Sequence, residues 1–225
     1  MRGKAVFSFG KTMHNTLYEF LKNANYSSPQ ENLFGEKDRL PMSIQSAQDL
    51  EQIYERRWID EWYESKKQKE EYYKLGKKII KDFYKECQNN PPKTLSLELP
   101  FNLKIGGHSL FGVIDRIDQR DGGVVIIDYK TGQSKDKLDF ENKAQLLIYQ
   151  IAAEEVLGLN PKELVYYYLE DGKQVAFLGT EEDKKAQKSK MLDQIEKIKN
   201  SEFEATPGWQ CQYCDFKDIC DFAQR

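Results

Sequence analysis

The segment 112–132, GVIDRIDQRDGGVVIIDYKTG, sets two runs of β-branched and aromatic residues on either side of an Asp-Gly pair. Such runs around Asp121-Gly122 predict a β-hairpin that is closed by a two-residue turn. A turn of this length places Arg120 opposite Gly123 and thereby sets the pairing of the two strands. This register constrains the fold most strongly, because it decides which charged residues of the hairpin share a face.

Several charged residues stand among the apolar residues of the predicted hairpin. In this register Asp115 lies directly opposite Asp128, at a spacing where like charges repel each other. The period of two also puts Lys130 on the face of Asp128, whereas Arg116 and Asp118 fall on the other face. One face of the hairpin therefore presents two carboxylates and an ammonium group.

Two interpretations of that face remain open. A structural ion pair explains Asp128 and Lys130, but it leaves the repulsion from Asp115 unrelieved. A divalent cation relieves it, because Mg²⁺ prefers oxygen ligands and is commonly held by one or two carboxylates together with water and phosphate. Lys130 beside such an ion could orient water and stabilise charge that develops on a phosphate group. The face therefore favours phosphodiester hydrolysis.

The composition restricts the class of protein. Of the 225 residues 39% are apolar, which is enough for the core of one domain spanning 1–225. The formal net charge is −3, so no overall basic character indicates a nucleic-acid partner, and DNA contact would need a local patch or a metal. No apolar run is long enough to span a membrane and no secretory leader is evident, so we expect a cytoplasmic protein without a membrane partner.

Hydrophobic periodicity predicts an α/β protein. Residues 10–24 form a predicted helix that Ser8 could cap, and 25–45 read as a loop. A strongly helical pattern follows in 46–88, which we interpret as a helical insertion. Besides the hairpin, the pattern predicts strands at 94–101, 164–169 and 174–179 and helices at 142–158 and 181–200. Elements in this order predict a mixed β-sheet flanked by helices.

Four short motifs occur in order along the chain: GKTMH at 10–14, GVID at 112–115, DYK at 128–130 and QLLIY at 145–149. This combination resembles the RecB-type exonuclease domain of the PD-(D/E)xK nuclease superfamily, which also occurs in AddB, in UvrD-like helicase fusions and in iron–sulfur CRISPR-associated exonucleases. The resemblance implies a restriction-endonuclease-like α/β fold.

The resemblance also implies roles for individual residues. His14, Asp115 and Asp128 would bind Mg²⁺ or Mn²⁺, with the backbone carbonyl of Tyr129 as a further ligand. Lys130 would assist the attacking water. By sequence alone, a surface or capping histidine is the plainer interpretation of His14, and the resemblance reverses this preference.

Three more residues belong to the site that the resemblance implies. Gln145 and Tyr149, one helical turn apart, would position DNA or the catalytic lysine. Glu98 lies where relatives often carry an acidic residue before the Asp strand, and it is a further candidate ligand of the metal. Gln145 and Tyr149 could equally be helix residues that pack against the edge of the sheet.

The C-terminal segment 207–225 is rich in cysteine, with Cys211, Cys214 and Cys220 spaced C-x₂-C-x₅-C. In a reducing compartment such thiols favour a metal over disulfides. Zinc and a [4Fe–4S] cluster both suit them, and the resemblance implies the cluster. Relatives carry the fourth ligand upstream of the first motif, where this chain has no cysteine. Either the chain is a fragment of a larger helicase–nuclease, or Cys87 takes that role.

Together, the residues and the resemblance lead us to expect a metal-dependent DNA exonuclease that hydrolyses phosphodiester bonds at single-stranded ends, in DNA repair or recombination. A helicase domain or subunit is the expected partner besides DNA. The alternative is a catalytically silent DNA-binding module of the same fold. Loss of a site residue would favour that alternative, and each expected residue is present in the sequence.

Overall fold

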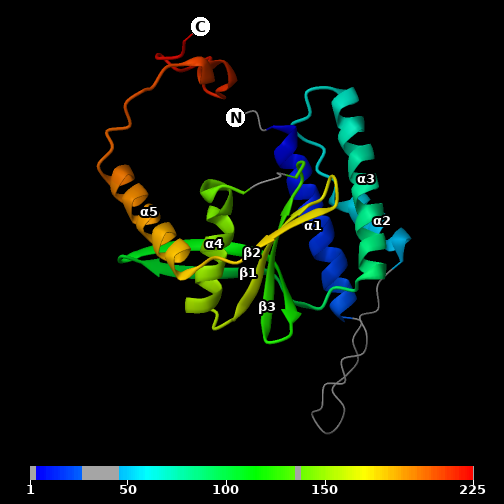
Figure 1. The fold of residues 1–225 in the computed structure, drawn as a ribbon. Coiled ribbons are helices and arrows are strands. Elements are labelled where there is room, and N and C mark those ends of the chain that lie inside the picture. The colour runs from blue at the N-terminus through cyan, green and yellow to red at the C-terminus, as the bar shows by residue number, and fades with distance from the viewer. Residues whose placement is uncertain (1–3, 27–45, 135–137, 225) are drawn as a thin grey trace.

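The computed structural model describes residues 4–26, 46–134 and 138–224; the predicted loop 25–45 lies outside them from residue 27 onward. Five strands form one sheet in the order β1-β2-β3-β4-β5 (Figure 1). The strands are β1 Thr94–Ile105, β2 His108–Arg120, β3 Gly123–Lys130, β4 Pro161–Tyr168 and β5 Lys173–Phe177. All neighbours pair antiparallel except β3 and β4, which are parallel. The predicted mixed sheet is confirmed.

Helices flank the sheet and give the protein two cores. The α-helices of the described residues are α1 Ala5–Tyr26, α2 Ala47–Arg57, α3 Lys66–Asn89, α4 Phe140–Glu155 and α5 Glu181–Lys199, and a short 3₁₀ helix, Trp209–Tyr213, follows them. The first core joins α1, α2 and α3 to β3 and β4. The second joins α4 and α5 to the other face, and α4 is the crossover that the parallel strands β3 and β4 require. No helix among the described residues is long and apolar enough to cross a membrane.

The first helix begins before the predicted residue 10. Ala5 and Phe9 are both buried, so the apolar stripe of α1 extends more than a turn further toward the N-terminus. The prediction that Ser8 caps this helix is therefore wrong. Ser8 lies inside α1, where its buried hydroxyl has no hydrogen-bond partner among the described residues.

The helical pattern of 46–88 forms two helices, so the prediction of helix is wrong for 58–65. Trp58 has extended backbone and its ring stacks on Tyr63, with 5.4 Å between the ring centroids. Ser65 then caps α3 by accepting a hydrogen bond from a backbone N–H of the first turn. The aromatic residues between α2 and α3 therefore pack on one another instead of continuing a helical stripe.

The predicted register of the β2–β3 hairpin is confirmed from the turn to Arg116, but the predicted pair of Asp115 with Asp128 is not part of the ladder. Arg120 pairs with Gly123, and the antiparallel pairs continue in step to Arg116 opposite Ile127. The ladder ends there, so Asp115 takes the next position without a paired partner on β3. β2 and β3 therefore separate at Asp115, the candidate site residue of β2.

The hairpin formed by β1 and β2 bends sharply at Glu98. Leu97 packs against the core under α1 to α3 and Leu99 packs against the core under α4, although residues two apart on a strand normally share a face. Glu98 between them has a φ of 47°, in the left-handed region. Beyond the bend, the strands continue to a turn at Gly106-Gly107, which the predicted strand 94–101 does not include.

Gly76 is expected to tolerate no side chain. A Cβ there would lie 2.2 Å from the hydroxyl oxygen of buried Tyr54, which donates to the Tyr73 carbonyl. Gly76→Ala should lower the free energy of unfolding by about 1–3 kcal/mol, because the ring must move. Gly10→Ala is the matched control in α1, since its Cβ would meet only Thr131 Oγ1 at 3.8 Å. That variant should gain about 0.5–1 kcal/mol from helix propensity. Urea unfolding measures both, and equal values would contradict the packing argument.

Candidate metal centre

The backbone of β3 is open where β2 separates from it. In place of the next ladder bond, the Tyr129 backbone N–H donates to Oδ2 of Asp115 at 2.9 Å. The carbonyl of Tyr129 lies on the same edge of β3, because the two groups of one residue point to the same side of a strand. A side chain and a backbone carbonyl thus come together at this opening.

α1 contributes His14 to the opening. Its Nε2 lies 3.2 Å from the Tyr129 carbonyl oxygen, and its Nδ1 lies 3.5 Å from Oδ2 of Asp115. Burial alone would lower the pKa of His14, but the hydrogen bond and charge of Asp115, together with the charges of Asp128 and Glu98, raise it above its ordinary value. The ring is therefore surrounded by oxygen atoms that attract a cation.

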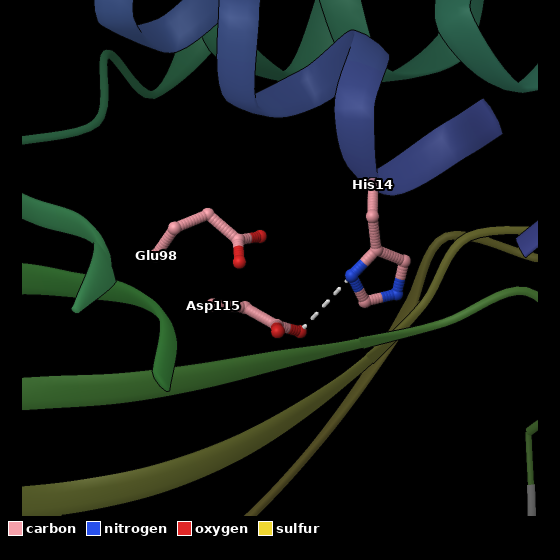
Figure 2. A group of neighbouring side chains, drawn as sticks. All are labelled: His14, Glu98 and Asp115. Atoms are coloured by element: carbon pink, nitrogen blue, oxygen red, sulfur yellow. Dashed lines mark ion pairs between the residues drawn. The ribbon is translucent and has the colours of Figure 1, made fainter. Parts of the chain in front are cut away.

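Glu98 lies beside Asp115 on the other side. The residues that flank Glu98 pair with those that flank Asp115, so the two carboxylates are neighbours across the β1–β2 ladder. Figure 2 shows the side chains of Glu98, Asp115 and His14 converging, and one possible ligand atom of each lies within 4.8 Å of the others. Partial burial and the charge of Asp115 raise the pKa of Glu98. Its strained backbone is of the kind that clusters at functional sites.

Asp128 and Lys130 form an ion pair on β3. Asp128 is only 2% exposed, and its Oδ2 lies 2.7 Å from Lys130 Nζ. Burial raises the pKa of Asp128 to about 6, because the lowering effect of Lys130 is opposed by the charge of Asp115. Within the described residues this oxygen accepts no hydrogen bond of good geometry. Electrostatic attraction, and not a directed hydrogen bond, therefore holds the ion pair together. Asp128 is thus a crowded carboxyl group that a cation would stabilise.

A chain of hydrogen bonds ties Lys130 to α4. Lys130 Nζ donates to Gln145 Oε1 at 2.7 Å, and Gln145 Nε2 donates to the Tyr149 hydroxyl at 2.9 Å. The structure therefore links Gln145 and Tyr149 to Lys130. These two residues do more than pack against the edge of the sheet. This network fixes the direction of the ammonium group.

Arg116 and Asp118 lie on the opposite face of the hairpin, as the register predicts. Arg116 is buried, forms an ion pair with Asp118 and donates to the Tyr129 hydroxyl at 3.0 Å. Their charges are thus neutralised under α3, away from the metal centre.

The donor set fits a divalent cation with a preference for oxygen. It combines an imidazole, a backbone carbonyl and several carboxylates whose mutual repulsion a cation would relieve. Over the described ranges, His14, Glu98 and Asp115 are the one group of three or more His, Cys, Asp or Glu side chains that converge in this way. Sequence reasoning kept Glu98 as the weakest candidate, because nothing in the sequence indicates the bend that turns it toward Asp115.

The four cysteines do not come together in the structure. Cys87 is buried near the end of α3, where burial raises its pKa to about 12. Cys211, Cys214 and Cys220 lie in the segment that extends beyond α5, at the other end of the molecule from the C-terminal end of α3 (Figure 1). These three thiols do not converge on one point in the described part of the chain either. The geometry therefore gives no support to Cys87 as a cluster ligand.

Comparison with known families identifies the superfamily of this chain. The family model of the PD-(D/E)XK nuclease superfamily matches residues 2–221. The chain belongs to this superfamily. The match includes all four motifs, so the candidate metal centre lies within the matched residues of this PD-(D/E)XK protein.

Two curated relatives are large helicase/nuclease proteins. The ATP-dependent helicase/nuclease subunit from Ligilactobacillus salivarius is 31% identical over 117 residues, which are 45% of this chain and 9% of that protein. The protein of the same name from Acetivibrio thermocellus is 29% identical over 105 residues, which are 38% and 8%. The matched segment is thus less than a tenth of either relative. Among solved structures, the crystal structure of SSO0001 aligns with 69% of this chain and 79% of that chain, at 20% identity and a TM-score of 0.41.

Proposed function

We propose that this superfamily member is a metal-dependent DNA exonuclease that acts on single-stranded ends. The observation that carries the proposal is the convergence of His14, Glu98 and Asp115 beside the ion pair of Asp128 and Lys130. Membership of the nuclease superfamily supports the hydrolysis of phosphodiester bonds. The names of both curated relatives support a helicase, in the same chain or as a partner, that delivers the DNA strand.

The chain offers a defined set of ligands for Mg²⁺ or Mn²⁺. In this proposal His14, Asp115 and Asp128 bind the cation with their side chains, Tyr129 binds it with its carbonyl, and Glu98 adds a further carboxylate. Such a cation would stabilise charge on the phosphate and make water more acidic. The carboxylates would hold the reacting phosphate only through this cation, because without it they would repel the phosphate.

Lys130 is the residue that we propose supplies a catalytic positive charge in addition to the metal ion. An ammonium group has three N–H donors; one donates to Gln145, and the charge of Asp128 holds the group from another side. A further N–H donor of this ammonium group is available to hold the attacking water or a phosphate oxygen. Tyr149 fixes Gln145, so the ammonium keeps its direction before substrate arrives, which reduces the cost of reorganisation in the transition state.

The test of this function is digestion of labelled single-stranded DNA with Mg²⁺, with Mn²⁺ or with a chelator. We expect progressive shortening with at least one of the metals and none with the chelator. Separate labels at the two ends show the polarity, and a circular single strand is the control, because an exonuclease leaves it intact. DNA binding without cleavage under both metals would support the catalytically silent module instead.

We also propose that the thiols of segment 207–225 bind a [4Fe–4S] cluster or zinc. Two backbone N–H groups already face these sulfur atoms, from Gly208 to Cys211 Sγ and from Phe216 to Cys214 Sγ, both at 3.4 Å. Hydrogen bonds of this kind support metal-bound thiolates.

Metal analysis after anaerobic purification tests this proposal. We expect bound iron with visible absorbance, or bound zinc without it, and loss of the metal in Cys211→Ser. Cys87→Ser should keep the metal, because Cys87 is buried away from the other thiols. A colourless protein without zinc would refute metal binding, and loss of the metal in Cys87→Ser would restore Cys87 as the fourth ligand.

A further inference from the structure

We propose that the outer face of the β1–β2 hairpin, beyond the bend, binds the single-stranded DNA that the metal centre cleaves. This surface, here called the hairpin strip, consists of Pro100, Asn102, Lys104, Ser109, Phe111 and Val113. The inference rests on the proposed function and adds to it the route of the substrate.

Alternation along both strands defines the hairpin strip. On β1, every second residue from 101 to 105 packs into the core under α4, and the residues between them are exposed. On β2, Phe111 and Val113 are 73% and 40% exposed. The ladder pairs Phe111 with Asn102 and Val113 with Pro100, so the outward residues of both strands form one continuous surface.

The hairpin strip leads directly to the metal centre. Val113 and Phe111 lie two and four residues before Asp115 on β2, so the hairpin strip ends beside the candidate site residue of that strand. On β1, Glu98 lies two residues before Pro100, so the bend at Glu98 marks the end of the hairpin strip next to the candidate metal centre. At about 3.3 Å per residue, Phe111 is roughly 13 Å along β2 from Asp115, which a strand of DNA spans in a few nucleotides. A strand with its phosphate at the metal centre can therefore continue over the hairpin.

The chemistry of the hairpin strip suits unpaired DNA. Phe111 presents an aromatic ring to solvent, and base stacking on such rings is the usual means of holding single strands without sequence preference. Lys104 Nζ donates to the Ser109 hydroxyl at 2.5 Å, which holds the ammonium group on the hairpin strip. Ser109 is two residues from Phe111 on β2, so this ammonium group can bind a phosphate of a strand that stacks on Phe111. Stacking needs an exposed base face, so this surface selects single strands over duplex.

Gly112 joins the hairpin strip rigidly to the catalytic residues. A Cβ at this position would lie 2.3 Å from the Phe101 ring, so the absence of a side chain lets that ring pack directly against β2. Phe101 in turn meets the Tyr149 ring edge-on, with 5.9 Å between centroids. Tyr149 is bonded through Gln145 to Lys130. The platform that carries Phe111 therefore packs on the same side chains that position the catalytic ammonium.

Binding of a fluorescent single-stranded oligonucleotide in the presence of chelator tests the inference. Phe111→Ala should bind about 5- to 100-fold more weakly than wild type, the range for loss of one stacked base. Phe203→Ala is the matched control, because it removes a ring of similar exposure, 74%, outside the hairpin strip, and it should bind as wild type does. Lys104→Ala should reduce both affinity and its dependence on salt. Circular dichroism confirms that each variant is folded.

Two further comparisons separate this inference from the proposed function. The defect of Phe111→Ala should disappear with a blunt duplex and with an oligonucleotide too short to reach from the metal centre to Phe111. If Phe111→Ala binds the long single strand normally while wild type digests DNA, the hairpin strip is refuted and the nuclease function stands. If binding depends on Phe111 but no metal supports cleavage, the hairpin strip stands and the nuclease function fails.

Discussion

Lys130→Ala is expected to slow DNA hydrolysis by about 100-fold or more, the usual effect of removing one group that stabilises charge in the transition state. The ammonium of Lys130 lies between Asp128 and Gln145, at 2.7 Å from an oxygen of each. Its loss also removes the positive charge that lowers the pKa of Asp128, which burial already raises to about 6. The pKa of Asp128 should therefore rise further, so that less of it is ionised to bind metal.

Single-turnover digestion with Mn²⁺ measures this effect. Lys162→Ala, which removes an exposed lysine of β4, is the control and should digest DNA at the wild-type rate. DNA binding by Lys130→Ala in chelator shows whether the fold persists. If this variant digests DNA as fast as wild type, Lys130 has no catalytic role.

Asp115→Asn is expected to abolish the stabilisation of the protein by Mn²⁺. For wild type, Mn²⁺ at about 100 times its Kd should add about 2.7 kcal/mol to the free energy of unfolding, or roughly 5–10 °C in Tm. The substitution removes the carboxylate charge closest to both His14 and Glu98. The amide oxygen of asparagine can still accept the hydrogen bond from the Tyr129 backbone N–H, so the local fold has a means of persisting.

Asp121→Asn provides the matched control in the same hairpin. Position 121 lies in the exposed two-residue turn, where Asn-Gly is as favourable as Asp-Gly. This variant should show the full thermal shift with Mn²⁺. A full shift in Asp115→Asn as well would exclude Asp115 as a metal ligand, whatever the activity of the variant.

The hairpin was predictable because its determinants are local. Asp121-Gly122 sets a two-residue turn, and the period of two then decides the face of every side chain without reference to the rest of the chain. The pairs from Arg120–Gly123 to Arg116–Ile127 follow that rule. The mixed sheet was predictable for a similar reason, since strand and helix periodicities are local signals.

The helical segment 46–88 shows where local periodicity fails. Trp58 belongs to the helical pattern of the sequence, yet its ring stacks on Tyr63 and the helix is interrupted between α2 and α3. Tertiary contacts among aromatic residues decided the conformation there, because a helix of this length depends more on packing than on intrinsic propensity.

The sequence by itself determined the hairpin, the placement of Asp128 and Lys130 on one face, and the four motifs that indicated a nuclease. Only the tertiary structure decided how these residues meet. The left-handed backbone at Glu98 bends β1, the departure of β2 from β3 frees the Tyr129 carbonyl edge, and α1 then brings His14 into the gap. Each of these depends on packing between segments far apart in the chain, and neither periodicity nor spacing contains that information.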